Sequence, residues 1–169
     1  MEVQRVMRHS VRTCHPNDSL NDAAQIMWED ASGSVPVVDE QRIPVGFLTD
    51  RDICMAAYTQ GRPLRTLQVE SAMARRIVSC RPTDDIGAVA KVMIQNGIRR
   101  LPVVGDDGKL IGLLTLDDLA CESHRNLKGS VNNQLGGVVA EVYGSISAAR
   151  CQRKHNTDPP LISSTPVTC

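Results

Sequence analysis

The segment LPVVGDDGKLIGLLTLDDL at residues 101–119 repeats the pattern of VPVVDEQRIPVGFLTDRDI at residues 35–53. The two segments lie 66 residues apart, and at this offset the chain matches itself without a gap from Val6 to about Cys54. Such self-similarity indicates two copies of one structural unit. A unit of about fifty residues buries too little surface to be stable alone, so we expect the copies to pack together about a pseudo-twofold axis.

Each copy predicts the same opening elements. A short strand at residues 11–14 or 77–80 is followed by a proline, and Asp18 or Asp84 then caps a helix. Apolar residues in that helix recur with the spacing i, i+3, i+4 and i+7, which is typical of one buried helical face. These positions are Leu20, Ala23, Ala24 and Met27 in the first copy, and Ile86, Val89, Ala90 and Met93 in the second.

Two further strands and a second helix complete each unit. The strands are expected at residues 35–38 and 45–48, and again at 101–104 and 110–114, with a turn between them. The second helix begins at Thr49 or Thr115. The order βαββα therefore occurs twice, and the sequence predicts an α+β fold.

Both copies place the pattern G-h-h-T-x-x-D, where h is apolar, at the junction between a strand and a helix. The free N–H groups and partial positive charge of a helix N-terminus attract anions, and Thr49 or Thr115 adds a hydroxyl. Asp52 or Asp118 offers two acceptor oxygens, which suit the two hydroxyls of a ribose. The same spacing is also that of a capping box, in which the acid only stabilises the helix. Both interpretations remain open.

Two basic residues distinguish the copies. Arg99 and Arg100 precede the strand expected at residues 101–104 of the second copy, where the first copy has Gly33 and Ser34. Arginine can hold a phosphate with two donors, although a solvated helix exit explains the pair equally well. If a phosphate binds, the arginines predict two unequal sites, with phosphate binding in doubt where Gly33 and Ser34 stand.

The duplicated h-P-V-V pattern followed by G-h-h-T-x-x-D resembles a tandem pair of cystathionine-β-synthase (CBS) domains, often called a Bateman module. The resemblance covers about residues 3–124 and implies two βαββα CBS repeats with clefts between them. By position, Asp52 and Asp118 would hold ribose hydroxyls, and Thr49 and Thr115 would face phosphate or ribose. The remaining residues implied at the ligand are Arg99 and Arg100 near phosphate, and Arg12, Thr13, Val78, Ser79, Val35 and Leu101 near the adenine.

The resemblance also implies a function. Such modules bind AMP, ADP, ATP or related adenosyl compounds, often form dimers, and modulate another protein. We therefore expect a regulatory adenine-nucleotide-binding module that needs no further cofactor, forms a homodimer and acts on a separate, unidentified protein target. The alternative is a scaffold that dimerises or docks without a ligand.

Composition excludes several other classes. Nineteen basic residues balance nineteen acidic ones, which argues against a broad basic face for nucleic acid. Apolar stretches are too short to span a bilayer, and no apolar signal-peptide run is present near Met1, so we expect a cytoplasmic protein. No catalytic triad, Walker loop or metal-ligand set is evident, and we expect no enzymatic activity. The candidates weighed for catalysis are Cys14, Cys80, His9, His15 and His124.

The expected domain boundaries follow from the repeat. Residues 1–58 form the first CBS domain, 59–66 a linker, and 67–124 the second CBS domain. Residues 125–150 are expected to form a helical extension, because apolar residues recur there in a loose stripe. Residues 151–169 are polar and proline-containing, which predicts a disordered tail.

Overall fold

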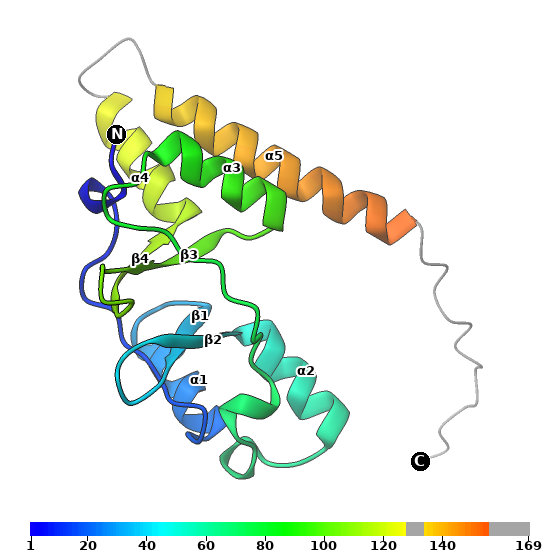
Figure 1. Cartoon of the computed structure of the whole chain (residues 1–169). Helices are drawn as coiled ribbons and strands as arrows, with labels where there is room; N and C mark the ends of the chain where they lie inside the picture. The colour runs from blue at the N-terminus through cyan, green and yellow to red at the C-terminus, as the bar shows by residue number, and fades with distance from the viewer. Residues whose placement is uncertain (128–133, 156–169) are drawn as a thin grey trace.

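The computed structural model describes residues 1–127 and 134–155, in which each repeat folds into its own half of the molecule (Figure 1). In the first repeat, strands β1 (Ser34–Val38) and β2 (Pro44–Thr49) pair in antiparallel fashion. Helices α1 (Leu20–Glu29) and α2 (Asp50–Gln60) flank this sheet. This half is the lower one in Figure 1.

The second repeat has the same elements and one additional helix. Helix α3 (Ile86–Asn96) precedes strands β3 (Arg100–Val104) and β4 (Leu110–Thr115), and α4 (Leu116–Leu127) follows them. Helix α5 (Gln134–His155) packs on α3 and α4. Helix α5 begins at Gln134 and runs to His155, which is five residues past the expected end of the helical extension at residue 150. Residues 156–169 of the predicted tail lie outside the described residues.

The two hairpins have the same register. Val35 lies opposite Leu48 in the first, and Leu101 lies opposite Leu114 in the second. Each register shifts at one place, after Val37 in β1 and after Val103 in β3. The α+β fold of two related units is therefore confirmed at the level of strand pairing.

The first predicted strand of each unit is reduced to one bridge. Cys14 pairs in parallel with Val37, and Cys80 pairs with Val103. A longer parallel ladder would need an amide hydrogen from the residue before Val37 or Val103, but Pro36 and Pro102 have none. The prolines two residues after each cysteine prevent extension in the other direction. The strands predicted at residues 11–14 and 77–80 are therefore not formed.

The caps of α1 and α3 lie one residue later than predicted. Ser19 caps α1 and forms a capping box with Asp22, whereas Asp85 caps α3. Asp18 instead accepts a hydrogen bond from the backbone N–H of His15 at 2.7 Å, so it stabilises the turn before the helix. Asp84 takes the same role in the second repeat, where it accepts a hydrogen bond from the backbone N–H of Arg81 at 2.8 Å.

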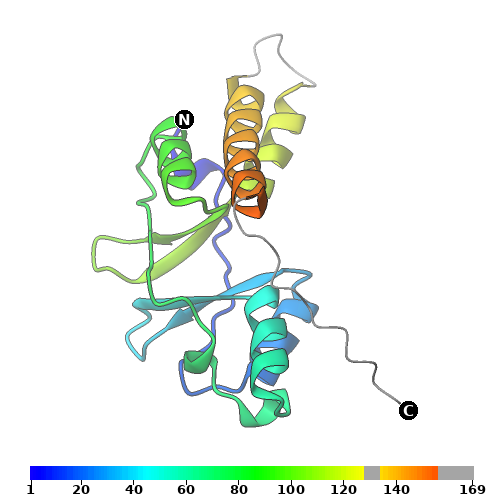
Figure 2. The same ribbon diagram turned by 90° about the vertical axis from the view of Figure 1, so that its right-hand side faces the viewer.

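Each repeat receives part of its core from a segment that precedes the other repeat. Short 3-10 helices at Val3–Arg5 and Val69–Ser71 carry these segments. We call residues 1–8 the N-terminal arm and residues 64–74 the linker arm. The N-terminal arm runs to the second repeat, and the linker arm runs along the first (Figures 1 and 2).

Backbone hydrogen bonds and apolar side chains hold both arms. Val3 N–H donates to the Asp84 carbonyl at 3.0 Å, and Val69 N–H donates to the Asp18 carbonyl at 2.9 Å. Val3 and Met7 are buried in the core of the second repeat, while Leu67 and Val69 are buried in that of the first. Full burial of such side chains contributes about 1.5–3 kcal/mol each. Each arm therefore completes the core of the repeat on which it packs.

No helix within the described residues is long and apolar enough to cross a membrane.

The linker arm provides a test of this arrangement. Leu67 is 2% exposed and packs in the first repeat, so Leu67→Ala should lower the free energy of unfolding by about 2–5 kcal/mol. Leu64→Ala, in the same arm but only partly buried, should cost less. Urea denaturation followed by circular dichroism measures both values. Equal losses in the two variants would contradict the proposed burial of the arm.

Candidate functional site

Thr49 and Asp52 form a capping box at the start of α2. The Thr49 backbone N–H and Oγ1 donate to Asp52 Oδ2 at 2.9 and 2.7 Å, and the Asp52 N–H donates to Thr49 Oγ1 at 3.3 Å. The other carboxylate oxygen, Oδ1, has no hydrogen-bond partner within residues 1–127 and 134–155. Capping therefore uses one oxygen of Asp52 and leaves the second available for a ligand.

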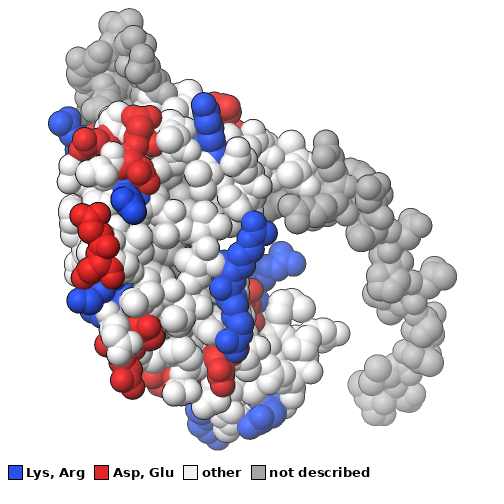
Figure 3. Space-filling model, viewed as in Figure 1, with Lys and Arg blue, Asp and Glu red and all other residues white. Residues whose placement is uncertain are grey.

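A cavity of about 220 Å³ lies beside this capping box, between the two repeats. We call it the Asp52 cavity. The first repeat contributes Phe47, Thr49 and Asp52. The linker arm and the second repeat contribute the other lining residues, which are Ala74, Arg76, Ile77, Val78, Gly97, Ile98, Arg99, Arg100 and Pro102. Basic side chains gather beside a hollow at the boundary between the repeats (Figure 3).

The arginine pair faces the opposite repeat from the one expected. Arg99 and Arg100 belong to the second repeat, yet they line the Asp52 cavity. A Cβ atom added to Gly33 would lie 3.6 Å from Arg100 Nη2, which shows that this guanidinium reaches the first repeat. The two arginines also line a smaller cavity of about 80 Å³ with residues at the start of α4 and Tyr143 of α5. The guanidinium groups of the second repeat therefore lie beside the N-terminus of α2 in the first repeat.

Thr115 and Asp118 form the matching capping box at the start of α4. Thr115 Oγ1 donates to Asp118 Oδ2 at 2.7 Å, as in the first repeat. Here the second oxygen is occupied, because Arg8 Nε donates to Asp118 Oδ1 at 2.7 Å. We call this place, defined by Arg8, Thr115 and Asp118, the Asp118 junction. The two capping boxes therefore differ in whether their outer carboxylate oxygen is free.

The other predicted ligand residues lie in different surroundings. Val78 lines the Asp52 cavity, whereas Arg12, its counterpart in the first repeat, forms ion pairs with Glu29 and Asp30 at the end of α1. Thr13 is partly buried and Ser79 is exposed, and neither lines the Asp52 cavity.

Val35 and Leu101 are buried in the two hydrophobic cores instead of lining the cavity. Side chains alternate between the two faces of a strand, so the cavity receives Arg100 and Pro102 on either side of Leu101. This differs from the expected place of both residues beside an adenine.

Sequence reasoning missed several lining residues. Phe47 and Ala74 lie side by side because their backbones exchange two hydrogen bonds, of 2.9 and 3.0 Å. Arg76 follows the linker arm, and Ile77 is the first residue of the strand predicted at 77–80. The offset of 66 offered one usable signal, because Ala74 corresponds to Arg8 and Arg76 to Ser10, and these pairs differ in charge.

The residues considered for catalysis do not gather into a reactive site. Cys14 and Cys80 are buried, and burial raises the pKa of each thiol to about 12, so both remain protonated at neutral pH. His9, His15 and His124 are exposed. Within the described part of the chain, no group of three or more His, Cys, Asp or Glu side chains is placed to hold a metal ion.

A second, larger cavity of about 730 Å³ lies between the first repeat and the linker arm. Its lining is mostly polar and includes Arg62, Arg65 and Arg75. Ser19 of the α1 capping box lines it, but neither of the two Thr–Asp capping boxes does, and it contains no residue of the second repeat's sheet or helices. Among the cavities described here, the Asp52 cavity joins a helix N-terminus, a free carboxylate oxygen and arginines.

Comparison with known proteins agrees with this architecture. The family model described as "CBS domain" matches residues 3–58 and 69–124. A CBS domain-containing protein of Bacillus subtilis, YhcV, is 38% identical over 124 residues, which is 73% of this chain and 86% of the relative. Protein MK0525 of Methanopyrus kandleri is 33% identical over 119 residues, or 70% of this chain, and the match spans 61% of that longer protein.

Solved structures show the same fold. The CBS domain pair of protein MJ0100, in complex with 5′-methylthioadenosine and S-adenosyl-L-methionine, is 27% identical with a TM-score of 0.65, covering 72% of this chain and 98% of that one. CBSX2 in complex with AMP is 26% identical with a TM-score of 0.63, covering 75% and 98%. Because the family model matches both repeats and the fold is shared, this chain belongs to the CBS domain family as a tandem CBS pair.

Proposed function

We propose that this chain is a regulatory module that binds an adenine nucleotide in the Asp52 cavity. The observation that carries the proposal is the meeting of Thr49 and Asp52 from one repeat with Val78, Arg99 and Arg100 from the other. Asp52 Oδ1 is free to accept from a ribose hydroxyl, and Ile77 and Val78 offer an apolar surface for a base. The adenosyl ligands of the MJ0100 and CBSX2 structures support this ligand class.

The charges in the cavity favour a nucleotide over an uncharged nucleoside. Arg76, Arg99 and Arg100 all line the cavity, and the N-terminus of α2 adds a partial positive charge. Arginine binds phosphate with two parallel donors, so AMP, ADP or ATP gains contacts that a methylthioadenosine cannot make. We therefore place the base and ribose between Val78 and Asp52, with the phosphate at the arginines.

Binding in this cavity would change the position of the arginine side chains or of one repeat relative to the other. The volume of about 220 Å³ is smaller than the roughly 300–1,000 Å³ of typical small-molecule sites. A nucleotide therefore requires a shift of the arginine side chains or of one repeat against the other. A separate protein that reads this shift would be the regulated target, and the chain itself acts in the cytoplasm without catalysing a reaction.

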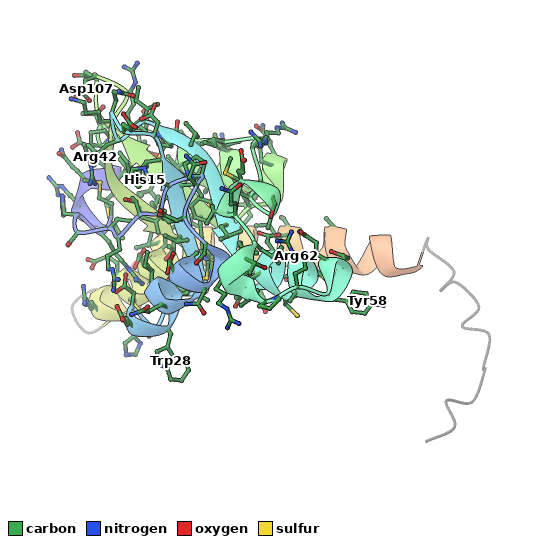
Figure 4. The ribbon with its side chains drawn as sticks, turned by 90° about the horizontal axis from the view of Figure 1, so that it is seen from below. His15, Trp28, Arg42, Tyr58, Arg62 and Asp107 are labelled. Atoms are coloured by element: carbon green, nitrogen blue, oxygen red, sulfur yellow. The ribbon has the colours of Figure 1, made fainter. Side chains whose placement is uncertain are left out.

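We propose in addition that a second copy covers the face formed by α1 and α2. A cavity of about 270 Å³ there is lined by Ala24, Met27, Trp28, Ser32, Asp50 and Ile53. Trp28 is 87% exposed and Tyr58 82%, and both point away from the body of the molecule (Figure 4). In the second repeat, α5 packs on α3 and α4 through Leu135, Val142 and Ile146, and this arrangement supports a similar covering of α1 and α2. A dimer is also the basis of the alternative scaffold function.

Removing the free carboxylate tests the ribose contact. Asp52→Ala should raise the Kd for AMP at least tenfold, or about 1.4 kcal/mol, in isothermal titration calorimetry. Asp22→Ala is the matched control, because Asp22 completes an equivalent capping box on α1 and does not line the Asp52 cavity. Both variants should lose a similar helix-capping contribution of about 1 kcal/mol, but only the first should lose affinity. Equal affinities in the two variants would contradict the proposal.

Removing one arginine tests the phosphate contact. Arg100→Ala should weaken AMP binding at least tenfold and leave the Kd of 5′-methylthioadenosine nearly unchanged, because only AMP carries a phosphate. Arg62→Ala, in the cavity beside the linker arm, serves as the control. A loss of AMP affinity in the Arg62 variant alone would place the ligand in that other cavity and overturn the assignment.

Light scattering after size-exclusion chromatography tests the dimer. The wild-type chain should elute with the mass of two copies, and Trp28→Lys should give one copy, since the charge would be buried at the interface. Tyr143→Lys alters an exposed aromatic residue of α5 and should keep the dimer. A monomeric wild type, or a dimer that survives Trp28→Lys, would refute this contact.

A further inference from the structure

The internal repeat places Arg8 and Ala74 at corresponding positions. Arg8 exchanges backbone hydrogen bonds with Leu113, of 2.9 and 3.0 Å, and Ala74 exchanges the same pair with Phe47. Both residues thus pair with the strand that leads into a capping box. The methyl group of Ala74 lines the open Asp52 cavity, whereas the long side chain of Arg8 turns onto Asp118.

The contact of Arg8 uses the carboxylate oxygen that a ribose would need. Asp118 Oδ2 is committed to Thr115, and Oδ1 accepts from Arg8 Nε. The Asp118 side chain is 12% exposed, whereas the Arg8 side chain that contacts it is 53% exposed. In the Asp52 cavity the corresponding oxygen has no partner among the described residues.

The side chain at the position that corresponds to Arg100 also differs between the repeats. Ser34 corresponds to Arg100, and its buried Oγ has no hydrogen-bond partner within the described residues. A buried hydroxyl without a partner destabilises the fold, and such groups commonly mark a place that a ligand or water occupies. At the Asp118 junction itself, Thr115 and Asp118 repeat the arrangement of Thr49 and Asp52, with Arg8 added.

We propose that Arg8 is the specificity-determining residue that makes the two repeats unequal: it closes the Asp118 junction and limits each chain to one nucleotide. This inference rests on the proposed function. A ribose can enter only by displacing Arg8 from Asp118, which replaces a hydrogen bond between two charged groups by one in which only the carboxylate is charged. The opposite role, in which Arg8 attracts a phosphate to the junction, predicts the opposite effect of its removal.

Calorimetric stoichiometry with AMP tests the closure. Wild-type protein should bind one AMP per chain, and Arg8→Ala should bind two. Arg5→Ala removes an exposed arginine from the same arm and should keep the value at one. Thermal unfolding of each variant shows whether a change in AMP stoichiometry comes from an unfolded N-terminal arm. A stoichiometry of one in a folded Arg8→Ala variant, or of two in the wild type, would overturn the inference.

The reciprocal exchange is a second, independent readout. Ala74→Arg places an arginine at the corresponding point of the Asp52 cavity, and should weaken AMP binding there at least tenfold. The double variant Arg8→Ala, Ala74→Arg should again bind one AMP, now sensitive to Asp118→Ala instead of Asp52→Ala. Unchanged affinity after Ala74→Arg would count against closure by an arginine at this position.

The outcomes separate this inference from the proposed function. One AMP in both the wild type and Arg8→Ala keeps the Asp52 site and refutes the closure. No binding to the wild type with one AMP bound to Arg8→Ala refutes the Asp52 site and supports the closure. No binding to either protein refutes both.

Discussion

The exchange of arms between the repeats is the constraint on which the rest of the structure depends. The N-terminal arm buries Val3 and Met7 in the second repeat, and the linker arm buries Leu67 and Val69 in the first. Each sheet has only two strands and two isolated bridges, one of them to an arm, which is marginal for independent stability. The arms therefore complete both cores and hold the two sheets together, so that the N-terminus of α2 faces the arginines of the second repeat.

The same exchange explains why duplicated motifs become different sites. Each arm pairs with the strand that precedes a capping box. The side chain at the paired position of the arm determines whether the capping-box aspartate has a cationic partner. Ala74 leaves Asp52 open, while Arg8 engages Asp118. The arginines at positions 99 and 100 add cations to one side only, because Gly33 and Ser34 stand in their place in the first repeat. A near-symmetric backbone thus carries an asymmetric distribution of charge.

Much of the fold could be predicted because the offset of 66 residues and the helical spacing of apolar residues are local patterns. The helices and hairpins appear where these patterns place them. Strands were predicted at residues 11–14 and 77–80 but are not formed. Their absence was missed because Pro36 and Pro102 lie in the pairing partner and not in the predicted strand itself. Thr49, Asp52, Val78, Arg99 and Arg100 were all identified as candidates, but the sequence did not show that the arginines face the other repeat. The Arg8–Asp118 contact spans 110 residues and leaves no local signal.

A crystal structure of the chain with AMP tests the central claim most directly, because the claim concerns which residues from which repeat surround one ligand. The account predicts AMP between the repeats, with its ribose on Asp52 Oδ1, its base beside Ile77 and Val78, and its phosphate at Arg99 and Arg100. Arg8 should remain on Asp118 in that complex. AMP bound at Asp118 with the Asp52 cavity empty, or AMP in the cavity beside Arg62, would contradict the account.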